Sequence, residues 1–63
     1  MQRSDLEMAL DERTFNPFVL TYAGGSLPVT DPRKALLGLS MVVVAGGDGR
    51  LYQIPFRAIE RIG

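Results

Sequence analysis

Few residues in this chain are suited to acid–base or nucleophilic chemistry. The sequence has no His and no Cys, so the commonest general base and the best thiol nucleophile are both missing. Glu7 and Asp11 are four residues apart, a spacing that would put two carboxylates on one face of a helix. Such a pair could act as acid and base, but a solvated helix face is the commoner outcome. We therefore expect a protein that is not an enzyme, with no catalytic residue, no cofactor and no metal site.

A glycine-rich segment, residues 46–49, is the second place where chemistry could occur. The backbone N–H groups of Gly46-Gly47-Asp48-Gly49 could cradle a phosphate. The Walker pattern, however, continues with Gly-Lys-Ser/Thr into a helix, whereas here Arg50-Leu51-Tyr52 continues as a strand. The segment is therefore predicted to be a hairpin turn.

Basic and aromatic side chains could contact an anion or a nucleic acid. Arginine and lysine neutralise phosphates, and tyrosine can stack on a base. The net charge of the chain is zero, and residues 13–63 have six basic residues against three acidic ones, a surplus of three. This is far from the strong basic stripe that nucleic-acid binding usually shows. Nucleic acid is thus the alternative partner, and its candidate contacts are Arg33, Lys34, Arg50, Arg57 and Tyr52.

The elements that must position these residues follow from hydrophobic spacing and turn signals. Ser4 and Glu7 form a capping-box pattern, and Leu6, Ala9 and Leu10 lie at helical spacing, which predicts a helix over about residues 5–13. Apolar or alternating runs bounded by Gly and Pro predict five strands, at about residues 18–23, 26–30, 40–45, 50–54 and 59–62.

The remaining signals concern the link between the second and third strands and the fold as a whole. Asp31-Pro32 reads as a cap and a first helical residue, which predicts a short helical turn over residues 33–36. A leading helix and five short strands predict a single mainly β (α+β) domain over residues 1–63, an antiparallel SH3-like or Sm-like barrel. An open antiparallel sheet with the helix across one face is the alternative.

Two apolar segments exceed what so small a core needs. Residues 40–45 are apolar on both strand faces, and residues 36–39 include three leucines that cannot all point into one core. A chain of this size buries only about 60% of its unfolded surface, and without Cys it has no disulfide to add stability. We therefore expect association with a second copy, or with another protein, through Leu36, Leu37, Leu39, Met41, Val42 and Val44.

Location is predicted from the same composition. The longest apolar stretch, residues 41–45, is too short to span a bilayer, and the first residues lack a signal-like apolar core. We expect a cytoplasmic protein without a membrane partner.

Several turn and core residues resemble a family of small uncharacterised bacterial proteins. The family pattern is Pro-Phe-x-x-x-Leu, Asp-Gly-Arg, His-Pro-Glu and a final Ile-x-x-Ile, and the resemblance covers about residues 14–62 through Pro17-Phe18, residues 48–50 and residues 59–62. The chain departs from it at residues 23–25, where Asp-Gly is common, and at residues 31–33, where Asp-Pro-Arg replaces His-Pro-Glu. The resemblance implies a bacterial origin and a small β-rich fold, and its motifs carry no chemistry.

Overall fold

One short helix precedes six strands in the structure, a computed structural model that describes residues 2–63. Two 3₁₀ turns, Pro32–Lys34 and Phe56–Ala58, lead into the third and the sixth strand. The helix is α1 (Arg3–Ala9), and the strands are β1 (Phe18–Tyr22), β2 (Gly25–Val29), β3 (Ala35–Leu37), β4 (Met41–Ala45), β5 (Leu51–Pro55) and β6 (Ile59–Ile62).

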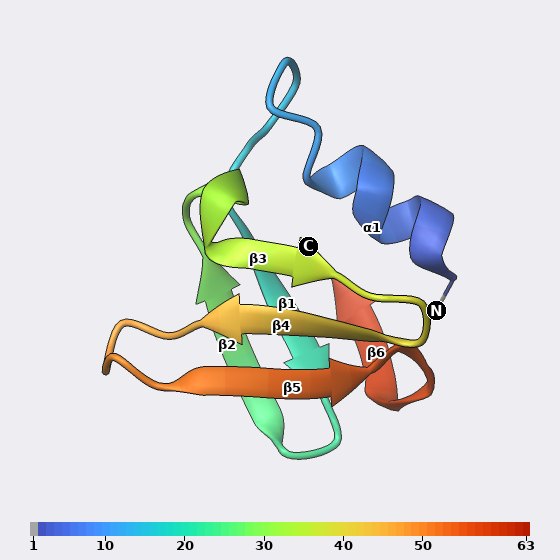
Figure 1. Ribbon diagram of the computed structural model, residues 1–63, viewed down its shortest axis with the longest axis vertical. Helices are drawn as coiled ribbons and strands as arrows, with labels where there is room; N and C mark the ends of the chain where they lie inside the picture. Colours follow the sequence, from blue (N-terminus) through green and yellow to red (C-terminus); the bar gives the residue numbers. More distant parts are fainter. Residues whose placement is uncertain (1) are drawn as a thin grey trace.

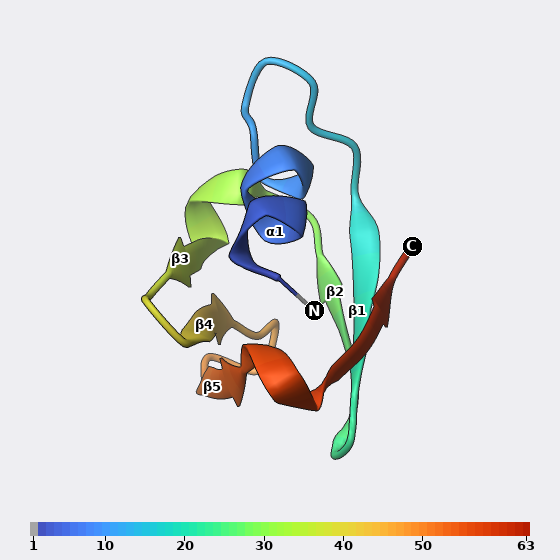
Figure 2. The same ribbon diagram turned by 90° about the vertical axis from the view of Figure 1, so that its right-hand side faces the viewer.

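The strands form two three-stranded antiparallel sheets, with the orders β2-β1-β6 and β3-β4-β5. The strands of one sheet cross behind those of the other (Figure 1). Figure 2 shows the two sheets facing each other, with α1 between them on the side of β3. The core lies between the sheets and under the helix, and consists of Leu6, Leu20, Leu27, Val29, Val42, Val44, Ile54, Phe56 and Ile59.

The predicted five-stranded barrel is wrong, although the mainly β class with a leading helix is confirmed. The chain has six strands, and no backbone ladder joins the two sheets within residues 2–63. The physical reason lies in the connections, because Pro32–Lys34 and Phe56–Ala58 are 3₁₀ turns at which the chain changes sheets. The alternative of one open sheet is also wrong, since the core is closed by two facing sheets.

The predicted helical turn over residues 33–36 is replaced by the 3₁₀ turn Pro32–Lys34 and strand β3. The Asp31 carboxylate caps the turn as expected and accepts a hydrogen bond from the backbone N–H of Arg33 at 2.9 Å. Alanine and leucine favour helices, yet Leu36 pairs with Val43 in the β3–β4 ladder. Tertiary pairing therefore overrides local preference here.

The helix begins and ends earlier than the predicted residues 5–13. The Asp5 carboxylate accepts a hydrogen bond from the Gln2 N–H at 3.2 Å, so the capping pair lies two residues before Ser4 and Glu7. The helix ends at Ala9, because the Asp11 carboxylate accepts the Arg13 N–H at 3.0 Å, a local turn that competes with helical hydrogen bonding. Within residues 2–63, no helix has the length and apolar character to cross a membrane.

Candidate interaction surface

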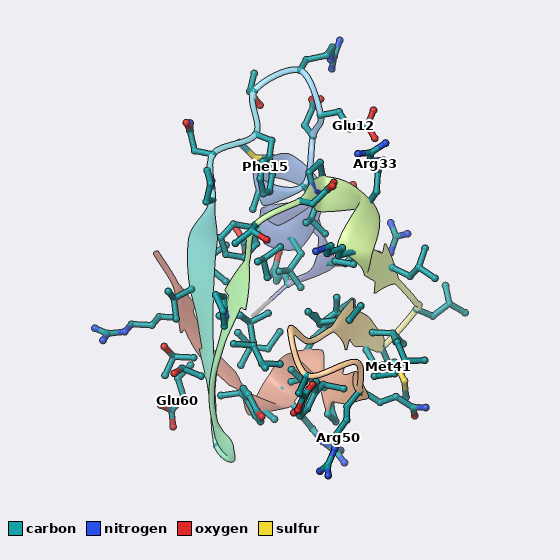
Figure 3. All side chains as sticks on the ribbon, turned by 90° about the vertical axis from the view of Figure 1, so that its left-hand side faces the viewer. Glu12, Phe15, Arg33, Met41, Arg50 and Glu60 are labelled. Atoms are coloured by element: carbon teal, nitrogen blue, oxygen red, sulfur yellow. The ribbon has the colours of Figure 1, made fainter. Side chains whose placement is uncertain are left out.

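One face of the β3-β4-β5 sheet is turned away from the core. Side chains alternate between the two faces of a sheet, and the register places Leu36 beside Val43 and Val43 beside Gln53. Figure 3 shows the Met41 side chain on the side of this sheet that lies away from the other sheet. We name this set the outer face, and it comprises Leu36, Met41, Val43, Ala45, Leu51, Gln53 and Pro55.

The outer face is apolar and without charge. Leu36 and Leu51 are each 71% exposed, and Leu39, in the turn between β3 and β4, is 96% exposed. Gln53 is the single polar side chain of the set. Isolated surface leucines are ordinary, but a contiguous apolar area on a small protein is typical of an interaction site.

The other sheet provides a contrast within the same molecule. Its outward positions follow from the β1 register and alternate with the buried Leu20 and Leu27. They are mostly polar, with Val19 as the one large apolar side chain at 41% exposure. The positions are Val19, Thr21, Ser26, Pro28 and Arg61. Only the β3-β4-β5 sheet therefore has an outer side suited to apolar contact.

A shallow groove of about 570 Å³ extends the outer face at one end. It lies between the β3–β4 turn and the start of the second 3₁₀ turn, where the Phe56 N–H donates to the Ser40 carbonyl at 3.0 Å. Arg57 lines the groove and takes part in none of the salt bridges found within residues 2–63. Its walls are Leu39, Ser40, Met41, Pro55, Phe56 and Arg57.

The structure divides the predicted interface residues into two groups. Leu36, Leu39 and Met41 lie on the outer face or beside it, whereas Val42 and Val44 are 1% exposed and belong to the core. Leu37 is half-buried and packs against that core. Val42 and Val44 are therefore not available to a partner in this fold, whereas Leu37 is only partly exposed.

Five members of the outer face were not among the predicted interface residues: Val43, Ala45, Leu51, Gln53 and Pro55. Strand alternation separates Val43 from Val42 and Val44, but it does not say which set faces the core. That choice depends on the pairing of β4 with β5, which aligns Val42 with the buried Ile54.

The candidate contacts for an anion or a nucleic acid do not converge. Arg33 forms a salt bridge with Asp31 at 3.1 Å, and Arg50 lies 4.0 Å from Asp48. The hydrogen bond from Arg33 lowers the pKa of Asp31. Lys34 and Arg57 form no salt bridge within the described part of the chain, and they flank opposite ends of the β3-β4-β5 sheet.

Tyr52, the aromatic candidate, is bound to its own hairpin. Its hydroxyl donates to the Asp48 carboxylate with an O–O distance of 2.6 Å. This hydrogen bond raises the pKa of Tyr52 and lowers that of Asp48. Gly49, at φ +82°, closes the hairpin turn by donating its N–H to the Gly46 carbonyl at 3.1 Å. The glycine-rich segment is therefore a turn, as predicted, and its aspartate already has a partner.

The two carboxylates considered for acid–base work are separated. Glu7 pairs with Arg3 on the helix, and Asp11 pairs with Arg13 beyond the helix end. Across residues 2–63, no polar or charged residue is buried, and no three potential metal-binding side chains come together.

Comparison of the chain with protein-family models, with curated proteins and with solved structures finds no match. The resemblance to the small bacterial family therefore stays a prediction. The protein is a small mainly β module whose distinguishing surface is one uncharged apolar sheet face.

Proposed function

We propose that this protein is a non-enzymatic interaction module that acts as a homo-oligomer, with the outer face buried between copies. The observation that supports this proposal is the contiguous apolar surface of the β3-β4-β5 sheet, with Leu36 and Leu51 mostly exposed. Removing apolar surface from water contributes about 25 cal/mol per Å². Covering this face would therefore stabilise the chain.

A second copy suits this face better than a charged partner. In a two-fold contact the same patch meets itself, so a net charge on the patch would face the same net charge. The outer face has none, and the whole chain has a net charge of zero. A charged partner would find no complementary group there.

Sedimentation velocity of matched variants tests the proposal. Leu36→Glu places a charge in the outer face, and we expect it to weaken self-association at least about tenfold, since burying an unpaired carboxylate is strongly unfavourable. Met8→Glu is the control, because Met8 is 76% exposed on α1 and lines a hollow with Phe18 and Ile62 of the other sheet. Equal association of both variants and the unsubstituted chain would exclude the outer face as the contact.

Nucleic-acid binding is the second candidate, supported by Lys34 and Arg57, two candidate contacts that form no salt bridge within residues 2–63. Such binding would weaken steeply with added salt. The engagement of Arg33, Arg50 and Tyr52 with nearby aspartates favours the first proposal over this one. The cytoplasmic location also stays a prediction.

A further inference from the structure

Each sheet ends in two edge strands, whose unpaired N–H and C=O groups can accept another strand. Three of the four edges have a feature that hinders pairing. In β2, Pro28 has no N–H to donate. Strand β6 is four residues long and its register with β1 shifts beside Tyr22. Strand β3 has three residues and packs against α1 (Figure 1). Arg3 Nε of the helix also donates to the Gly38 carbonyl, just after β3, at 3.1 Å.

The fourth edge, β5, is open. It has five residues in unbroken register with β4, and it contains no charged side chain. Proline occurs only at its last position, Pro55. Natural proteins usually block a regular edge strand with charges, prolines or a covering segment. Because β5 has no such protection before Pro55, it is indicated as a pairing site.

The hydrogen bonds at the two ends of the β4–β5 hairpin show which pairs of residues are bonded. The Gly46 N–H donates to the Arg50 carbonyl at 2.8 Å, and the Phe56 N–H donates to the Ser40 carbonyl at 3.0 Å. Bonded and non-bonded pairs alternate along an antiparallel ladder.

This alternation identifies the free groups of β5. In the observed register, Tyr52 and Ile54 direct their backbone groups toward β4. Leu51 and Gln53 therefore direct their N–H and C=O groups to the open edge, where nothing within residues 2–63 bonds them.

We infer that β5 pairs antiparallel with β5 of a second copy about a two-fold axis at Tyr52. The β3-β4-β5 sheet then continues across two chains. Leu51 lies opposite Gln53 of the partner subunit, and the two such pairs use all four free N–H groups. The inference rests on the proposed homo-oligomer and adds a separate contact to it, because the edge lies in the plane of the sheet and the outer face lies above that plane.

Chemistry favours this register and a second copy as the occupant. Because β5 has no charged side chain, two copies of it can pair without repulsion between like charges. The axis at Tyr52 also places Arg50 opposite Ile54 of the partner subunit and not opposite another arginine. Moving the axis to Gln53 would place Leu51 opposite Pro55 of the partner subunit, which has no N–H. That register would leave the Leu51 carbonyl of each chain without a donor, whereas the axis at Tyr52 pairs every free N–H and C=O group of Leu51 and Gln53.

Amide hydrogen exchange of the full chain, measured by NMR over a range of concentrations, tests the contact without substitutions. We expect the Leu51 and Gln53 amides to exchange more slowly as the chains associate, about tenfold where roughly nine chains in ten are paired. Gly47, at the hairpin tip, is the reference amide and should keep its rate. Associated chains whose Leu51 and Gln53 amides exchange at their monomer rates would overturn the inference.

Single cysteines test the register, because the chain has none of its own. Tyr52→Cys would face itself across the axis at a non-hydrogen-bonded position, where Cα atoms are about 4.5 Å apart and a disulfide fits. Gln53→Cys is the control, since it would face Leu51 of the partner subunit. We expect mild oxidation to cross-link Tyr52→Cys at least about tenfold faster than Gln53→Cys.

The outcomes separate the inference from the proposed function. Cross-linking of Gln53→Cys as fast as Tyr52→Cys would overturn the register. A chain that associates without amide protection and without the Tyr52→Cys cross-link would overturn the edge contact and leave the homo-oligomer standing. A chain that stays monomeric in the same samples would overturn both.

Discussion

Three aspartates in this protein each hold the arginine two residues further along the chain. In every case the carboxylate accepts the backbone N–H of that arginine, at 2.9 to 3.0 Å, and lies within 4.0 Å of its guanidinium. The local pairing closes turns and neutralises the basic side chains that would otherwise attract an anion. The pairs are Asp11 with Arg13, Asp31 with Arg33 and Asp48 with Arg50.

These carboxylates predict how stability depends on pH. Hydrogen bonds, first of all from the side chains of Arg13, Arg33 and Tyr52, hold their pKa values below the usual 3.8 in the folded state. Their contribution to the stability of the fold is therefore complete above about pH 3.8. It is lost as the pH falls through the lowered pKa values of the folded state.

Thermal melting followed by circular dichroism at fixed protein concentration checks this dependence. We expect a melting temperature that changes little between about pH 5 and pH 7 and falls steadily below about pH 4. The Asp48→Asn variant should show a shallower fall. A melting temperature that rises on acidification would contradict the assignment.

The hydrogen bond between Tyr52 and Asp48 predicts a shifted tyrosine titration. Because the carboxylate accepts the phenolic hydrogen, the pKa of Tyr52 lies above the ordinary 10.0. In a Tyr22→Phe background, tyrosinate absorbance reports Tyr52 alone. Adding Asp48→Ala should return its pKa toward 10.0, and an unchanged titration curve would show that the hydrogen bond does not form.

At the scale of elements, strands bounded by glycine and proline were the most predictable part of the fold. Phe18–Tyr22 and Met41–Ala45 follow the alternating or apolar patterns that indicate strands. Ala35–Leu37 was not predictable in this way, since its residues favour helix and its strand state depends on pairing with β4. The outer face was only partly predictable for the same reason. Which side chains of β4 face the core depends on its pairing with β5, which the sequence alone does not give.

The helix is attached to the sheets mainly by one side chain. Leu6 is the buried residue of α1 and is 1% exposed. A seven-residue helix is too short to persist alone, so packing must hold it.

Leu6→Ala therefore tests the attachment of the helix. We expect it to lower the free energy of unfolding by about 2–5 kcal/mol through lost burial and the cavity left behind. Met8→Ala on the same helix is the matched control, with 76% exposure and an expected change within about 0.5 kcal/mol. Denaturant unfolding measures both, and equal effects would contradict the packing described for α1.

At the scale of the whole molecule, the two sheets divide their apolar side chains differently. The β2-β1-β6 sheet buries or half-buries its large apolar residues except Val19 and exposes mostly polar ones. The β3-β4-β5 sheet is apolar on both sides, with Val42 and Val44 in the core and Leu36 and Leu51 outside. One chain covers only one side of this sheet, and we propose that a second copy covers the other.

Light scattering on a size-exclusion column, with absorbance recorded in the same run, tests this claim most directly. We expect a mass of at least two chains of 6.9 kDa, which falls toward one chain on dilution. We also expect the absorbance of a protein with two Tyr and no Trp, without the excess that bound nucleic acid would add. A mass of 6.9 kDa at every concentration would contradict it.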